Sequence, residues 1–411
     1  MALSTEDLPQ QVRDFKRTMK AKCPDYKRRF EEVSRAMEAE IARIKKEEAT
    51  GSAIPQFEFS SIAEHGFNEE QRHRLHQAGC GIIRNTLPEQ EVAAHNDALS
   101  RYIIENGYYE HTPTVEDNYF SQLKSDKPQI FGIYWSPAQI WARQHHNMAV
   151  TRRHLNRLWT WQNNGKTFFN PDQEASYADR VRRREPGDAT LGLSPHVDSG
   201  SIERWIEPHY REVYYNIFQG DWQQYNAFDG ANRVDVEEFP SPAVCSVFRT
   251  FQGWVALTPQ GKGDGTLQVV PSTLAIPYML LRALQDDVPE DELCGAAPGR
   301  ALTVSKEWHP LLFEGLVSVS QVHAGDTMWW HPDTIHAVED KHNGTGYSNV
   351  LFIGAAPDCE KNRRFLDKQR PAFLKGESCP DFAPEHHERT YQGRATELDL
   401  TDLGRRQMGF D

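Results

Sequence analysis

The stretch Ser194-Pro-His-Val-Asp-Ser-Gly-Ser201 contains two candidate metal ligands, His196 and Asp198, separated by one residue. On a β-strand this spacing places both side chains on the same face, because side chains alternate with a period of two. Two histidines and one carboxylate around an iron leave three positions open, which is typical of non-haem Fe(II) oxygenases. The stretch therefore predicts a metal site, provided that a second histidine comes from elsewhere in the chain.

The His-x-Asp pattern occurs three times in the chain, so its context has to decide between the copies. His95-Asn-Asp97 lies in a predicted amphipathic helix, where residues i and i+2 do not converge. His331-Pro-Asp333 indicates a turn, and its proline removes a donor from any strand ladder. His196-Val-Asp198 instead follows a predicted strand, Leu191-Gly-Leu193, and precedes small residues that leave room for an ion.

The second histidine is predicted to be His336. Gly325 and Asp326 mark a turn, a predicted strand follows, and His336 lies just beyond that strand. We expect His196, Asp198 and His336 to bind one Fe(II) and to form the catalytic centre. The alternative, in which the two histidines are hydrogen-bonded core residues without a metal, stays open at this point.

The surrounding sequence predicts a mainly β protein with flanking helices, of the α+β class. Short β-branched runs separated by Gly, Pro and Asp are typical of a sandwich, jelly roll or barrel. We expect one domain over residues 1–411, with a double-stranded β-helix (jelly roll, cupin-like) core over residues 178–357. The strands predicted within that core include 244–257, 266–270, 316–322, 327–330 and 347–353.

The flanks are predicted from helical periodicity. Residues 1–177 should form an N-terminal helical flank with the first strands, and residues 358–411 a covering segment. A charged helix is expected over residues 1–50, with an apolar stripe of Val33, Met37, Ile41 and Ile44. A strand is expected over 79–86, a helix from 88 to about 106, and another helix within 137–163.

The composition of the chain indicates which classes of binding partner can be excluded. The formal net charge of -13 argues against general nucleic-acid binding, because phosphate contacts need a concentrated basic surface. The sequence has no basic and apolar leader and no membrane-length apolar run. The six cysteines include no Cys-x-x-Cys pair, so we expect free thiols and a reducing compartment. A cytoplasmic protein that acts on a small molecule, with no membrane or nucleic-acid partner, is the expectation.

Three elements in a fixed order carry a resemblance to a known family. They are Ser194 to Asp198, Gly265-Thr-Leu-Gln-Val-Val-Pro-Ser272, and Gly325 to His336. In this order they resemble the Fe(II)/2-oxoglutarate-dependent oxygenase superfamily, near its phytanoyl-hydroxylase-like branch. Tyr134-Trp-Ser-Pro-Ala-Gln139 and Asn343-Gly-Thr-Gly-Tyr-Ser-Asn-Val350 are similar to the YbiU-like family, and this similarity runs over most of the chain.

The resemblance implies Fe(II) as cofactor, with 2-oxoglutarate and O2 as cosubstrates. It further implies oxidation of an unactivated C–H bond in a small metabolite, such as an amino acid or another carboxylate. Hydroxylation, desaturation and oxidative cyclisation all stay open as outcomes. The rival from another class is a non-oxygenase cupin, either an isomerase or lyase or a small-molecule sensor. Cupins usually carry three histidines and a glutamate, and this spacing does not show them.

One feature of the superfamily pattern is missing. Many members bind the distal carboxylate of 2-oxoglutarate with an Arg or Lys on the strand about ten residues past the second histidine. Residues 343–354 contain no basic residue. A buried carboxylate still needs a cation or several donors, and Arg249, within a mostly apolar strand, is the expected anchor. Its alternative is an edge-strand arginine that points to solvent, and Ser348 is expected to add a hydrogen bond.

Two further residues are expected near the substrate. Arg204 follows the metal motif and could pair with a substrate carboxylate, although an ion pair with Glu203 or Glu207 is an equal alternative. Phe352 lies on the predicted strand after His336 and is expected to line the pocket, with core packing as its alternative.

Overall fold

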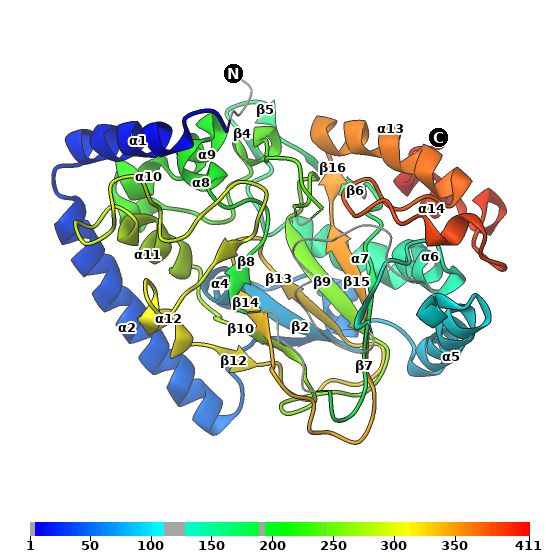
Figure 1. The fold of residues 1–411 in the computed structure, drawn as a ribbon. Coiled ribbons are helices and arrows are strands. Elements are labelled where there is room, and N and C mark those ends of the chain that lie inside the picture. The colour runs from blue at the N-terminus through cyan, green and yellow to red at the C-terminus, as the bar shows by residue number, and fades with distance from the viewer. Residues whose placement is uncertain (1–4, 111–127, 189–193, 243) are drawn as a thin grey trace.

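The computed structural model describes residues 5–110, 128–188, 194–242 and 244–411 (Figure 1). The predicted strand Leu191–Leu193 lies outside these residues. The described chain has a mixed α/β fold with two main sheets, and the smaller of these carries His196 and His336. No helix in the described ranges has the length and apolar character needed to cross a membrane.

The larger sheet has seven strands in the order β1-β2-β13-β9-β15-β7-β3. Its strands are β1 (Gln56–Glu58), β2 (Cys80–Arg84), β3 (Ile130–Phe131), β7 (Val181–Arg184), β9 (Phe251–Ala256), β13 (Thr327–Trp330) and β15 (Ser348–Ala355). The smaller sheet has the order β11-β8-β14-β10-β12. Its strands are β8 (His196–Val197), β10 (Leu267–Val269), β11 (Leu302–Thr303), β12 (Val317–Ser318) and β14 (His336–Val338).

The chain alternates between the two sheets. It passes from β7 to β8, β9 and β10, and later from β13 to β14 and β15, changing sheet at each step. Trp254, Met328 and Val350 of the larger sheet share one apolar cluster with Leu267 and Val269 of the smaller sheet. The inner faces of the two sheets therefore pack together. Each strand predicted from residue 244 onward overlaps a strand of the structure, but two of them are shorter than predicted. Residues 244–250 precede β9, so Arg249 does not lie within the strand as expected, and β12 covers only part of 316–322.

The helix expected over residues 1–50 is two helices, α1 (Leu8–Lys22) and α2 (Tyr26–Thr50). Pro24 lies at the break, and the ring of a proline within a helix removes a donor and clashes with the preceding turn. The apolar stripe of α2 is fully buried as predicted. It packs against α11 (Ala275–Arg282), and Figure 1 shows α2 running along one side of the molecule.

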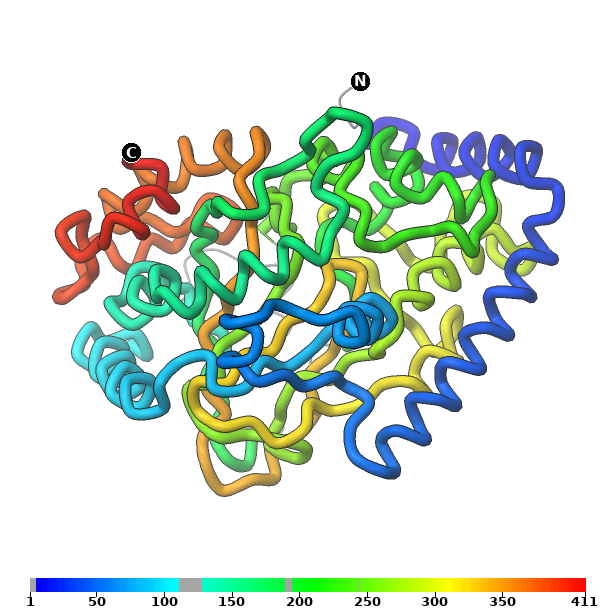
Figure 2. The backbone as a smooth tube through the Cα atoms, turned by 180° about the vertical axis from the view of Figure 1, so that it is seen from behind, coloured from blue at the N-terminus to red at the C-terminus, as the bar shows by residue number. Residues whose placement is uncertain are grey.

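The remaining helices flank the sheets. Seen from behind in Figure 2, the chain of α4 lies in front of the larger sheet, and α4 contacts β2. The helices expected near 88–106 and 137–163 are present, the second as two helices, α6 and α7. The helices are α3 (Phe59–His65), α4 (Glu69–Ala78), α5 (Glu89–Glu105), α6 (Pro137–Gln144), α7 (His146–Asn156), α8 (Glu203–Ile206), α9 (Pro208–Val213), α10 (Tyr215–Phe218), α12 (Pro310–Phe313), α13 (Glu360–Lys375) and α14 (Asp402–Gln407).

The boundaries of the predicted core differ from those of the sheets. β1, β2 and β3 precede residue 178 yet belong to the larger sheet, so the N-terminal flank supplies part of the core. Two short two-stranded sheets lie outside both: β4 (Gln162–Asn163) with β5 (Lys166–Thr167), and β6 (Asn170–Glu174) with β16 (Pro357–Asp358). All six cysteines are buried free thiols, as predicted.

Candidate metal centre and adjoining cavity

Two neighbouring strands of the smaller sheet bring the predicted triad together. His196 on β8 pairs directly with His336 on β14, and their ring centroids lie 4.3 Å apart. Asp198 follows β8, and its two carboxylate oxygens lie 3.4 Å from Nε2 of His196 and 3.4 Å from Nε2 of His336. One ligand atom from each residue lies within 4.8 Å of the others, so a single small cation between them can contact all three.

Backbone carbonyls orient the two imidazoles. Nδ1 of His196 lies 2.7 Å from the carbonyl oxygen of Ser194, and Nδ1 of His336 lies 3.1 Å from that of Thr334. A carbonyl accepts only from N–H, so these contacts place the proton of the neutral ring on Nδ1 and leave Nε2 to coordinate. Burial alone would raise the pKa of Asp198, but the adjacent His336 and His196 imidazoles hold it well below its usual value.

The small residues after Asp198 form a tight turn. Ser199 has φ 67° and Gly200 has φ 89°, both in the left-handed region. A Cβ atom at Gly200 would also lie 3.2 Å from a carboxylate oxygen of Glu203. That carboxylate accepts hydrogen bonds from the backbone N–H groups of Ser201 and Phe239. Besides leaving space, the small residues therefore let the chain reverse directly beside the triad.

Two side chains that sequence reasoning did not assign to the centre fix Asp198. Nε2 of Gln252 on β9 donates to Oδ2 of Asp198 at 2.7 Å. A guanidinium nitrogen of Arg204 donates to the backbone carbonyl of Asp198 at 2.7 Å. Gln252 is a polar residue in the otherwise apolar strand β9, and that contrast is the only signal of its position in the sequence.

Arg204 is not a lining residue of the cavity beside the triad, and it forms an ion pair, which is the kind of contact given as its alternative. Its side chain is fully buried and donates to Oδ1 of Asp333 at 2.6 Å. Asp333 also accepts from Arg233 at 2.8 Å and from the Tyr225 hydroxyl at 3.2 Å. The alternative partners, Glu203 and Glu207, are replaced by an aspartate far away in the sequence. The third His-x-Asp copy thus supplies the partner of an arginine network.

The remaining copy of the motif is also remote from the centre. His95 stacks on Trp141, with ring centroids 4.0 Å apart, on the flanking helix α5. Of the described histidines, cysteines and carboxylates, only His196, Asp198 and His336 come together as a group that could hold a metal.

A cavity of about 110 Å³ opens directly beside the triad. Phe352 lines it, as expected, together with other apolar side chains. Arg249 also lines it and is buried, whereas the sequence left open that it points to solvent. Ser348 is not a lining residue of this cavity, and its hydroxyl donates to the side-chain carbonyl of Gln260 at 2.6 Å. The apolar lining is formed by Ile130, Val244, Trp254, Leu267, Trp330, Val338, Phe352, Ile353 and Phe382.

A second buried guanidinium, that of Arg182, also faces the cavity. Arg182 lies on β7 directly opposite Val350 of β15, and it donates to the carbonyl of Gly265 at 2.7 Å. Burial, reinforced by nearby Arg184, lowers the pKa of the Arg182 guanidinium to about 9. Sequence reasoning did not single out Arg182, although Arg182 and Arg184 are two residues apart on β7 and so lie on one face of the strand.

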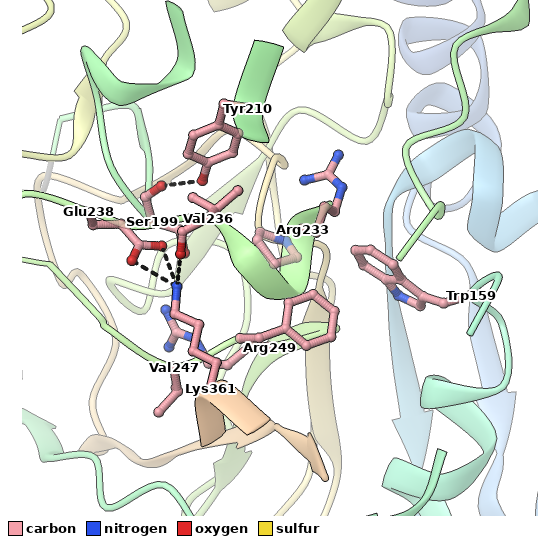
Figure 3. Close-up of a pocket in the computed structure, with 11 residues that line it drawn as sticks. Trp159, Ser199, Tyr210, Arg233, Val236, Glu238, Val247, Arg249 and Lys361 are labelled. Atoms are coloured by element: carbon pink, nitrogen blue, oxygen red, sulfur yellow. Dashed lines mark hydrogen bonds and ion pairs between the residues drawn. The ribbon is translucent and has the colours of Figure 1, made fainter. Parts of the chain in front are cut away.

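A side pocket lies next to the cavity and shares Arg249 with it (Figure 3). Lys361 and Glu238 form an ion pair of 2.9 Å in this pocket. Figure 3 shows this pair and Arg249 on one side of the pocket and Trp159 on the other. Ser199, the residue after Asp198, also lines the pocket, and its carbonyl accepts from the Tyr210 hydroxyl at 2.6 Å.

Comparison with known proteins places the chain in a family. A model of the family described as Gig2-like matches residues 6–410. The chain belongs to the Gig2-like family. The Escherichia coli K12 protein YbiU is 42% identical over 403 residues, which are 97% of this chain and 96% of YbiU. The resemblance to YbiU-like proteins is thus confirmed.

Two solved structures of relatives share the fold of this Gig2-like protein over its full length. One, from Salmonella typhimurium LT2, carries the provisional name oxidoreductase, is 41% identical, and has a TM-score of 0.95 over 100% of this chain and 99% of its own. The other is the GlcNAc-inducible protein GIG2 of Candida albicans, 27% identical, with a TM-score of 0.82 over 100% of this chain and 91% of its own.

Proposed function

We propose that this Gig2-like protein is a non-haem Fe(II)/2-oxoglutarate-dependent dioxygenase that oxidises a C–H bond of a small metabolite. The observation that carries the proposal is the triad of His196, Asp198 and His336 at the wall of a cavity that both apolar and charged side chains line. For hydroxylation, the substrate R–H, 2-oxoglutarate and O2 give R–OH, succinate and CO2. One oxygen atom then ends in the product and the other in succinate.

The path of the chain supports the proposal. Strands β7, β8, β9 and β10 alternate between the two sheets, and so do β13, β14 and β15. Such alternation between two packed antiparallel sheets is what a double-stranded β-helix or jelly roll requires. In this interpretation His196 and His336 occupy adjacent strands of the smaller sheet and face the interior of the barrel.

The donor set fits Fe(II). Two imidazoles and one carboxylate suit this ion, and the triad leaves coordination positions free on the cavity side. Gln252 holds the carboxylate, and the carbonyls of Ser194 and Thr334 hold the rings. A bound iron would couple the oxidative decarboxylation of 2-oxoglutarate to removal of a hydrogen atom from the substrate. The apolar lining of the cavity would limit the access of water.

We assign the distal carboxylate of 2-oxoglutarate to Arg182. β15 is the strand that follows His336, and its residues 348–355 are all uncharged. Arg182 reaches the cavity from the next strand, opposite Val350. Within the described part of the chain, the Arg182 guanidinium donates to one backbone carbonyl and forms no ion pair, so a carboxylate bound there would compensate its charge, and charge-assisted pairs of this kind are strong. This assignment replaces Arg249, the anchor expected from the sequence.

The proposal is tested by succinate formation and metal content. Wild-type protein supplied with Fe(II), 2-oxoglutarate and air is expected to release succinate, even slowly without substrate. Asp198→Ala and His196→Ala should lose bound iron and succinate release. His95→Ala is the matched control, because its ring stacks on Trp141 in a helix, and it should retain both. Iron loss in His95→Ala, or no succinate from the iron-loaded wild type, would overturn the assignment and favour a non-oxygenase cupin.

A further inference from the structure

Arg249 lines both the main cavity and the side pocket, and Figure 3 shows it among the residues of the side pocket. The residue is only 7% exposed, and its Nε is buried without a hydrogen-bond partner. Its guanidinium carbon lies 5.4 Å from the ring centroid of Tyr177, a cation–π contact. Such a contact stabilises a cation less than a carboxylate partner does. Among the described residues, no carboxylate forms an ion pair with Arg249.

Three carboxylates lie close enough to Arg249 to favour its charged form, those of Asp198, Asp179 and Asp381, and each has other partners. Asp179 lies 3.6 Å from Nε of Arg180, and Asp381 accepts hydrogen bonds from Ser246 and from the Tyr177 hydroxyl. Lys361 pairs with Glu238 at 2.9 Å, which leaves that pair neutral. Arg233 shares the single carboxylate of Asp333 with Arg204, so this cluster keeps an excess positive charge. Asp198 faces the two imidazoles of the triad and accepts from Gln252. None of the described carboxylates forms a direct ion pair with Arg249, so a carboxylate that a ligand brings into the cavity can still pair with its guanidinium.

The backbone of β15 makes room for Arg249. A Cβ atom at Gly354 would lie 3.1 Å from Cδ of Arg249, which is closer than most such contacts. The glycine therefore lets the arginine stem lie against the strand while its guanidinium reaches the two cavities. The apolar lining of the main cavity adjoins the same guanidinium.

We propose that Arg249 binds a carboxylate of the substrate, and that the apolar body of this carboxylic acid lies against the cavity wall beside the triad. The inference rests on the proposed function for the role of substrate, and it names the substrate class. 2-Oxoglutarate brings one carboxylate to the iron and one to a cation, which Arg182 supplies. Arg249 is a second buried cation at the same cavity, so it can bind a second carboxylate, which the substrate would supply.

The test is a binding titration with the full-length, metal-free protein. Hexanoate and hexanamide are the probes, because they share an apolar chain and differ in charge at one end. Wild type should bind hexanoate at least about tenfold more tightly than hexanamide, as expected for a buried charge pair. Equal binding of the two probes, or no binding of hexanoate, would overturn the proposal.

Variants locate the effect. Arg249→Met should abolish the preference for hexanoate, and Arg249→Lys should keep part of it. Arg182→Met is the matched control, a buried arginine on the same cavity, and should keep the preference. Loss of the preference in Arg182→Met but not in Arg249→Met would show that hexanoate binds at Arg182 and would overturn the proposal. Without any probe, the melting temperature of Arg249→Met should stay near that of wild type, because Arg249 forms no ion pair with a described carboxylate and its Nε makes no hydrogen bond. A purely structural Arg249 would lower it.

The two proposals can fail separately. Succinate formation with Fe(II) tests the oxygenase, whereas the hexanoate preference is measured without iron. Anion binding that depends on Arg249 in a protein that forms no succinate would overturn only the oxygenase function. Succinate formation in a protein without that preference would overturn only the carboxylate subsite.

Discussion

Gln252 donates a hydrogen bond of 2.7 Å to the Oδ2 atom of Asp198 that faces His336. This contact links β9 of the larger sheet to the metal centre on the smaller one. Residues that orient metal ligands typically change metal affinity by about 10- to 100-fold when they are lost. We therefore expect Gln252→Leu to weaken Fe(II) or Co(II) binding by that factor in an anaerobic titration.

Gln56→Leu is the control for this substitution. Its amide donates to Ser320 at 3.0 Å on an exposed edge strand, far from the ligand set in the sheet order. The metal affinity of Gln56→Leu should match that of wild type. An unchanged affinity in Gln252→Leu would show that the triad holds Asp198 without help.

Asp333 is expected to contribute strongly to the stability of the fold, because its single carboxylate compensates the buried guanidiniums of Arg204 and Arg233. Breaking a buried pair by neutralising one partner typically costs about 3–5 kcal/mol. Asp333→Asn should lower the free energy of unfolding by an amount in that range in urea. Asp172→Asn, in a half-exposed pair with Arg157, should change it by less than about 1 kcal/mol. Equal effects of the two would contradict the buried-network interpretation.

Arg182 is expected to determine the affinity for 2-oxoglutarate. Removing one partner of a buried charge pair costs about 2–5 kcal/mol, and about 1.4 kcal/mol is a factor of ten. Arg182→Met should therefore raise the apparent KM for 2-oxoglutarate, measured by succinate release, by on the order of 100-fold. Arg183→Met is the control, since Arg183 points to the opposite face of β7 and contacts the Tyr347 ring. If both variants had a similar KM for 2-oxoglutarate, Arg182 would not be the residue that binds its distal carboxylate.

The ligand set could be predicted from the sequence because it depends on local order. His196 on β8 and Asp198 just after it are two residues apart in extended sequence, and a later strand supplies His336. The supporting residues depend on tertiary pairing instead. Nothing near Arg204 in the sequence indicates Asp333, which lies 129 residues away.

For the same reason, the sequence alone does not show that Arg182 faces the cavity. The superfamily pattern places the basic residue on the strand after His336. In this protein that strand is β15, which contains no basic residue. Arg182 lies across the ladder from that strand, and only the register between β7 and β15 reveals it. The break between α1 and α2 has a signal in the sequence, because Pro24 lies between the two helices. The charged residues on both sides of Pro24 nevertheless led to the prediction of one continuous helix.

Glu388 links the C-terminal segment to the chain before α6. Its carboxylate accepts from the backbone N–H groups of Tyr134 at 2.6 Å and Trp135 at 3.0 Å, and from the Tyr102 hydroxyl at 2.8 Å. Burial raises the pKa of Glu388 from 4.5 to about 7, although these donors act in the opposite direction. The folded protein then holds this proton more tightly than the unfolded chain does.

Stability should therefore fall as pH rises through the interval between the two pKa values of Glu388. The contribution is fully present below 4.5 and is lost above about 7. Glu388→Gln removes this titration, so the difference in unfolding free energy, wild type minus variant, should decrease from pH 5 to 7 and then level off, as urea titrations at several pH values would measure. Glu360→Gln, whose side chain is 85% exposed, should leave the pH dependence of wild type intact. A difference that increases with pH would show that the three donors outweigh burial and that Glu388 stays ionised in the folded protein.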